Sequence, residues 1–170
     1  MVSEALLFCF LFALVTGGFL AYHFTPGDHQ VVYDGAYEPL RGVGMSAAYE
    51  STLRLGFEVE NGLLMRQLHN KSLAVLVLGT VVWAVLARHR YAFAALGLCL
   101  VGGLSGYVAV DDMFSGVISG GVWSYVLHLL VALGMGAVLV IASRREAARE
   151  PRTPALVATA CCLALLLIWL

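Results

Sequence analysis

The chain has 170 residues, of which 61% are hydrophobic and only 12% are charged, and its mean hydropathy is +0.87. Soluble domains carry about 25% charged residues, so this composition excludes a disordered chain and argues against an ordinary cytosolic domain. The formal net charge of −1 provides no basic surface for nucleic acid. One domain is expected at this length, and we take residues 1–170 as a single transmembrane domain.

Five apolar stretches are long enough, or nearly so, to cross a membrane as helices of about 20 residues. In chain order they cover residues 5–21, 63–87, 91–110, 122–143 and 154–170. The first lacks the basic amino-terminal region and the cleavage site of a signal peptide, so we expect it to be retained. The sequence therefore predicts an all-α, polytopic membrane protein. It comprises a four-helix bundle over residues 5–143 and an additional transmembrane helix over residues 154–170.

The arginines predict how the chain is oriented. They gather in the connections 88–90 and 144–152, which the positive-inside rule places in the cytoplasm. The connection that holds Asp111 and Asp112, and the long acidic connection after the first helix, are expected outside, so the N-terminus is cytoplasmic. Within the long connection, residues 47–57 have helical spacing and are expected to lie on the outer membrane surface.

Two of the five histidines, His69 and His128, lie inside apolar stretches. An ionisable residue in a membrane helix is costly, and it indicates function. Each lies about six residues, or about 9 Å, from the outer start of its helix, so the two are expected at one depth on parallel, diagonal helices. This favours two neutral imidazoles as axial ligands of one heme iron. The alternative is two independent core histidines, each with its own hydrogen-bonding partner.

Other residues near this depth are candidates for holding a heme. Gly17 and Gly106 lie on the two helices without a ligand, where small residues would leave room for a flat ring; the alternative is plain close packing of membrane helices. Arg66, Lys71 and Arg54 are candidates to pair with the heme propionates. Arg66 is the first choice because it precedes the first histidine by one turn. The alternative for Arg66 and Lys71 is snorkelling to the interface.

Several segments carry a family resemblance: VTGGFLAYHFTP (15–26), YDGAYEPLRGV (33–43), MSAAYESTL (45–53), GLLMRQLH (62–69) and GYVAVDDMFSG (106–116). They resemble the N-terminal half of cytochrome b, the heme-bearing subunit of quinol–cytochrome c reductases, and above all its actinobacterial menaquinol branch. In that family an arginine-x-x-histidine segment supplies an axial ligand and a propionate contact for the outer heme. Arg66 and His69 match these positions. The approach to His128 resembles that of the fourth-helix ligand.

The chain also departs from this family. Cytochrome b carries a second histidine on each ligand helix, but 14 residues after His69 and His128 stand Trp83 and Ala142. The motif of the outer quinol site and the C-terminal half of the family are absent. The resemblance therefore implies one outer heme b and not a complete quinol oxidase. Heme A synthase also places histidines on the second and fourth helices, but its histidine-arginine pair is missing.

The expected function is electron transfer by a cytochrome b-like subunit, with one heme b, of a larger membrane redox complex or a homodimer. We expect the protein to be surrounded by membrane lipid in the plasma membrane of a bacterium, specifically of an actinobacterium. One alternative is a quinone-reactive oxidoreductase subunit that exchanges electrons with menaquinone near Tyr107, Asp111 and Asp112. Another is a heme-free structural subunit. No catalytic residue is assigned. The outer-loop histidines His23 and His29 are further candidates for a second metal.

Overall fold

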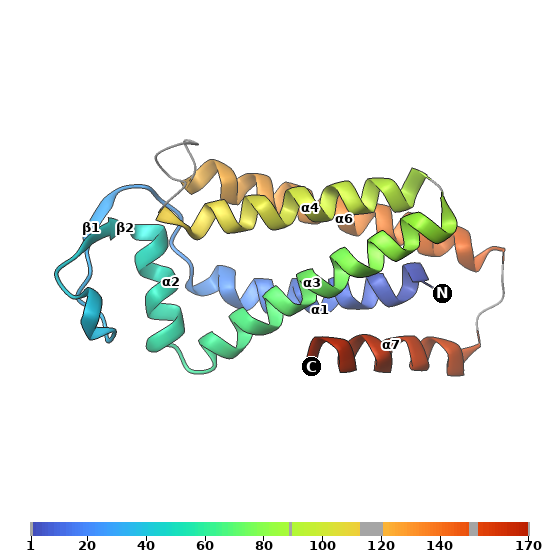
Figure 1. Cartoon of the computed structure of the whole chain (residues 1–170), viewed down its shortest axis with the longest axis horizontal. Coiled ribbons are helices and arrows are strands. Elements are labelled where there is room, and N and C mark those ends of the chain that lie inside the picture. Colours follow the sequence, from blue (N-terminus) through green and yellow to red (C-terminus); the bar gives the residue numbers. More distant parts are fainter. Residues whose placement is uncertain (1, 89, 113–120, 150–152, 170) are drawn as a thin grey trace.

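The computed structural model of the chain describes residues 2–88, 90–112, 121–149 and 153–169. Four long helices run lengthwise through the molecule (Figure 1), and each is long and apolar enough to cross a membrane. They are α1 (Val2–His23), α3 (Gly62–Ala87), α4 (Arg90–Val110) and α6 (Gly121–Ala147). These bounds agree with the expected ones to within about one turn. The all-α, polytopic membrane fold is thereby confirmed.

The four helices surround one axis in the order α1, α3, α4, α6. Helix α3 packs against α1 and α4, and α6 packs against α4 and α1, so α3 and α6 lie on a diagonal of the bundle. Successive long helices alternate in direction (Figure 1), and α3 and α6 are therefore parallel. The expected diagonal arrangement of the two histidine-bearing helices is confirmed.

Small and hydroxylated side chains lie where the helices pack closely. Ala92, Ala95, Ser72 and Thr80 are fully buried. The Ser72 hydroxyl donates to the Leu68 carbonyl at 2.7 Å, and the Thr80 hydroxyl donates to a carbonyl on its own helix at 2.8 Å. Small residues let membrane helices approach closely, and a hydroxyl that bonds its own helix leaves no polar group unsatisfied.

The two ends of the bundle differ in chemistry. One end carries Arg88, Arg90, Arg144 and Arg145, and we call it the arginine end. The other, the loop end, carries β1 (Gln30–Val32), the 3₁₀ helix η1 (Glu38–Leu40), β2 (Gly44–Ser46) and α2 (Ala47–Phe57). Strands β1 and β2 pair antiparallel, and α2 packs against α3 and α4 across this end (Figure 1). The expected helix over residues 47–57 is confirmed.

Ser46 connects the loop end to the bundle through two hydrogen bonds. The Ser46 hydroxyl accepts from the Tyr49 amide at 3.0 Å and thereby caps the N-terminus of α2. The Ser46 amide in turn donates to Oδ2 of Asp112 at 3.0 Å. Asp112 lies just beyond α4, so its carboxylate joins the loop end to the end of a membrane helix.

Helix α7 (Pro154–Trp169) occupies the place of the expected fifth helix and packs against α1 and α3. It has 16 residues, or about 24 Å at about 1.5 Å per residue, which is less than the about 30 Å of a hydrocarbon core. It is therefore apolar like the other four but shorter than each of them. The Lys71 ammonium on α3 donates to the Trp169 carbonyl at 3.3 Å and joins the two helices.

Candidate functional site

His69 on α3 and His128 on α6 face each other across the bundle, towards its loop end. Their ring centres are 6.3 Å apart, and the rings are inclined by 67°. Each histidine stands seven residues after the first residue of its helix, from 62 to 69 and from 121 to 128. The structure therefore brings together two imidazoles at one depth from the two diagonal, parallel helices.

Each imidazole is bonded through Nδ1 to a backbone carbonyl of the neighbouring helix. Nδ1 of His69 lies 3.0 Å from the Ala13 carbonyl of α1 and 3.2 Å from the hydroxyl of Thr16. Nδ1 of His128 lies 2.8 Å from the Gly102 carbonyl of α4. A carbonyl oxygen can only accept, so Nδ1 carries the proton in both rings. In the neutral imidazole, Nε2 is then left with its lone pair.

This tautomer is the one that metal-ligating histidines adopt, with the second ring nitrogen donating to a carbonyl or a carboxylate. A metal–nitrogen bond of about 2 Å on each side, and about 1 Å from each nitrogen to its ring centre, places two axial imidazole centres about 6 Å apart. The observed separation of 6.3 Å agrees. Two imidazoles alone make a poor site for a bare ion, but they fit an iron that a porphyrin already holds.

The remaining described residues fit a bare metal ion less well. Across residues 2–88, 90–112, 121–149 and 153–169, no group of three or more histidine, cysteine or acidic side chains converges to hold one. His23, a candidate for a second metal, packs instead against the rings of Phe19 and Tyr22, with ring centres 4.9 and 5.0 Å away.

Gly17 and Gly106 lie against the two imidazoles. A Cβ at Gly17 would come 2.9 Å from Cε1 of His69, and one at Gly106 would come 2.9 Å from Nδ1 of His128. Both separations are too short for a real contact. The sequence predicts that these glycines make room for a flat ring, and in the structure the atoms nearest to each position belong to a histidine.

The glycines also stand in a fixed relation to the two accepting carbonyls. Gly17 follows Ala13 by four residues, and Gly106 follows Gly102 by four. In a helix, the carbonyl of residue i points towards residue i+4, whose Cβ leans back over that turn. A glycine at i+4 therefore leaves the carbonyl open to a donor from another helix. Both His69 and His128 therefore bond a carbonyl that is followed by a glycine four residues later.

Thr16 is a contributor that the sequence analysis did not single out. It is 2% exposed, and its hydroxyl donates to a carbonyl within α1 at 3.0 Å. Its oxygen is then free to accept from Nδ1 of His69 at 3.2 Å. The threonine beside the glycine pair in the segment 15–26 is the signal that could have found it.

The three basic candidates for pairing with a propionate lie in different surroundings. Arg66 is half-buried one turn from His69, and within the described residues it has no hydrogen bond or ion pair. Lys71 bonds the Trp169 carbonyl. Arg54 on α2 forms ion pairs with Asp34, Glu50 and Glu58. The hydrogen bond to Glu50 is the largest of the effects that raise the pKa of Arg54 above its ordinary value.

Comparison with known proteins gives the site a context. No protein-family model matches the chain. The cytochrome b subunit of the cytochrome bc1 complex of Corynebacterium diphtheriae is 40% identical over 69% of this chain. Its counterpart in Mycobacterium leprae is 37% identical over 69%, and that in Streptomyces coelicolor is 34% identical over 68%.

The match covers only part of these proteins, because the chain spans 23–24% of the length of the curated relatives. Identity at this level over more than two thirds of the chain still establishes common descent. The chain is a homologue of the cytochrome b subunits of actinobacterial cytochrome bc1 complexes.

Proposed function

We propose that the chain is a membrane electron-transfer subunit that holds one heme b between His69 and His128. The observation that carries this proposal is the pair of imidazoles 6.3 Å apart, each bonded through Nδ1 to a carbonyl of a neighbouring helix. The heme, when bound, supplies one-electron chemistry. His69 and His128 would hold the heme through Nε2, and the carbonyls of Ala13 and Gly102 hold each ring in one tautomer and orientation.

Only one heme is proposed, and the packing at the arginine end supports this number. Trp83 and Ala142 stand where the family carries its second pair of histidines. Both are 2% exposed, and both belong to one apolar cluster with Leu6, Leu76 and Leu139. Neither side chain can ligate iron, and the indole fills space in the bundle.

The surroundings of the site follow from the same proposal. We place the N-terminus and the arginine end in the cytoplasm, because arginines concentrate on that side of bacterial membrane proteins. The heme then lies near the outer face. The relatives are named as subunits of the cytochrome bc1 complex, so we propose that this chain also works within a larger membrane redox complex, or as a homodimer.

A second candidate function is electron exchange with menaquinone at the loop end. The Tyr107 hydroxyl and the Asp111 carboxylate are hydrogen-bonded near the end of α4, and Tyr107 is 56% exposed. A phenol and a carboxylate at the membrane surface could accept protons from a quinol. Added menaquinol should then reduce the heme of the purified protein quickly. A heme that dithionite reduces and menaquinol does not would exclude this candidate.

Replacing either ligand tests the heme site itself. His69→Ala and His128→Ala should each remove the sharp low-spin b-type signal from the reduced-minus-oxidised absorption spectrum, because one imidazole cannot provide both axial bonds. The matched control is His23→Ala, which removes a histidine that packs against the rings of Phe19 and Tyr22 and should leave the spectrum unchanged. Helix content by circular dichroism shows that each variant is folded. A full low-spin spectrum in either ligand variant would refute the proposal.

The close approach of Gly17 to His69 predicts that alanine substitutions at two neighbouring glycines have different effects on heme affinity. Gly17→Ala places a Cβ 2.9 Å from His69, whereas a Cβ at Gly18 meets no atom within 4 Å. Loss of a group that orients a ligand costs about 10–100-fold in metal affinity. The heme affinity of Gly17→Ala should therefore fall at least about tenfold, while Gly18→Ala keeps that of the parent.

Heme titration of the apoprotein measures both glycine variants. Alanine favours a helix over glycine by about 1 kcal/mol, so weaker binding in Gly17→Ala alone cannot come from a weaker helix. Equal affinities in the two variants would show that the space beside His69 is not needed.

Arg66 is expected to pair with a propionate and to set the heme potential. A positive charge about 10 Å from the iron, at an effective dielectric constant of about 20, stabilises the reduced state by roughly 1–2 kcal/mol. Arg66→Gln should therefore lower the midpoint potential by several tens of millivolts. Arg41→Gln removes the same charge from an exposed ion pair with Glu38 and should leave the potential unchanged. An unaltered potential in Arg66→Gln would remove this arginine from the site.

A further inference from the structure

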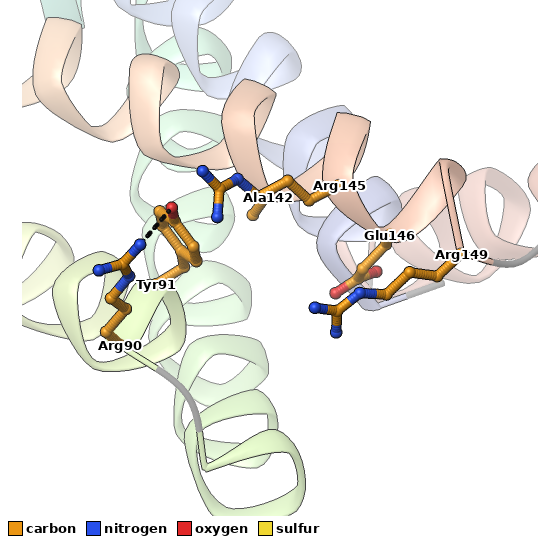
Figure 2. A pocket seen from close by; sticks show the side chains of 6 residues that line it. All are labelled: Arg90, Tyr91, Ala142, Arg145, Glu146 and Arg149. Atoms are coloured by element: carbon orange, nitrogen blue, oxygen red, sulfur yellow. Dashed lines mark hydrogen bonds between the residues drawn. The ribbon is translucent and has the colours of Figure 1, made fainter.

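A second feature of the molecule lies at the arginine end, away from the two histidines. A hollow of about 230 Å³ opens between the start of α4 and the end of α6 (Figure 2). It is lined by Arg90, Tyr91, Ala142, Arg145, Glu146 and Arg149. A single water needs about 10–15 Å³ of such space, so the hollow is large enough for a tetrahedral anion.

Two guanidinium groups converge on one ring in this hollow. The guanidinium carbons of Arg90 and Arg145 each lie 5.1 Å from the centre of the Tyr91 ring. Nη2 of Arg90 also donates to the Tyr91 hydroxyl at 3.3 Å. Contacts with an aromatic ring hold guanidinium groups in place. Figure 2 shows both arginines reaching the ring, one from each helix.

The charges in the hollow are unbalanced. Three arginines and one glutamate line it, so positive charges exceed negative ones by two. The Glu146 carboxylate accepts from the Ser3 hydroxyl at 2.6 Å, and Figure 2 shows it beside Arg149 rather than beside Tyr91. Among the ion pairs of the described residues, none involves Arg90 or Arg145. Most of the five N–H donors of each guanidinium are therefore available to a ligand.

This donor set matches a phosphate group. Guanidinium recognises phosphate through paired hydrogen bonds, with a geometry that a point charge cannot provide. Two arginines held on one ring present such donors from two directions. An anion between them would stand on the Tyr91 side of the hollow, away from the Glu146 carboxylate.

The position of the hollow favours a phosphate that belongs to a lipid. Arg145 lies one turn beyond Ile141, and Arg90 lies one turn before Phe93, so each arginine shares a helix face with an apolar side chain deeper in the bundle. Ile141 is 45% exposed and Phe93 is 57% exposed. A headgroup at the arginines would have its acyl chains along these apolar side chains. Basic hollows between membrane helices are suited to anionic headgroups.

We propose that this hollow binds the phosphate of an anionic phospholipid, with Arg90 and Arg145 as the principal contacts. The site is independent of the heme proposal, because it lies at the opposite end of the bundle from the two histidines. It would anchor the ends of α4 and α6 to one leaflet and to each other.

Native mass spectrometry of the whole chain in detergent tests the lipid site. The probes are palmitoyl-oleoyl phosphatidylglycerol, which is anionic, and palmitoyl-oleoyl phosphatidylcholine, which has the same acyl chains and a zwitterionic headgroup without net charge. We expect phosphatidylglycerol to bind at least tenfold more tightly. Arg90→Gln and Arg145→Gln should each weaken its binding by about tenfold, as expected for the loss of charge-assisted hydrogen bonds. The charge-matched control Arg41→Gln, at the loop end, should bind like the parent.

Inorganic phosphate is the second probe and tests the other source of the anion. Phosphate binding that Arg145→Gln weakens, with no preference for phosphatidylglycerol over phosphatidylcholine, would assign the hollow to free phosphate and overturn the lipid proposal. No lipid preference and no phosphate binding would overturn it as well. Equal weakening in Arg41→Gln and Arg145→Gln would overturn it too, because net charge would then explain the effect. Arg145→Lys keeps the charge and loses the paired geometry. We expect it to bind more weakly than the parent and at least as tightly as Arg145→Gln.

Discussion

The candidate site depends on two hydrogen bonds, each from an imidazole Nδ1 to a backbone carbonyl of an adjacent helix. They join α3 to α1 at Ala13 and α6 to α4 at Gly102. Each bond fixes one tautomer, and the two rings lie with their centres 6.3 Å apart. Each also requires an open carbonyl, which a glycine one turn later provides. The site is therefore held by four helices, although only α3 and α6 carry the two histidines.

The interior of the bundle differs between its two ends. Towards the loop end, polar ring atoms meet across the diagonal. Towards the arginine end, Trp83 and Leu139 pack in an apolar core. A chain with one heme near one face cannot carry electrons across the whole membrane by itself. In our account it hands electrons to, or takes them from, a partner at the loop end, where Asp112 holds the short strands against the bundle.

Much of this could be predicted from the sequence, because hydropathy fixes the length and place of membrane helices. The four spans, the helix over residues 47–57 and the diagonal position of the two histidines followed from pattern and depth. The accepting carbonyls did not, because every residue has one, and only the packed helices show which lie beside a histidine. The roles of Thr16 and Gly17, the three carboxylates around Arg54 and the hollow at Tyr91 likewise depend on contacts between distant segments.

The central claim is that one iron is held between two imidazoles in each chain. The most direct test is a pyridine hemochrome assay on the purified protein, joined to a potentiometric titration followed by absorbance. Our account predicts one b-type heme per chain and a single one-electron transition. Two hemes with two potentials, or a folded protein that binds no heme even when reconstituted, would contradict it.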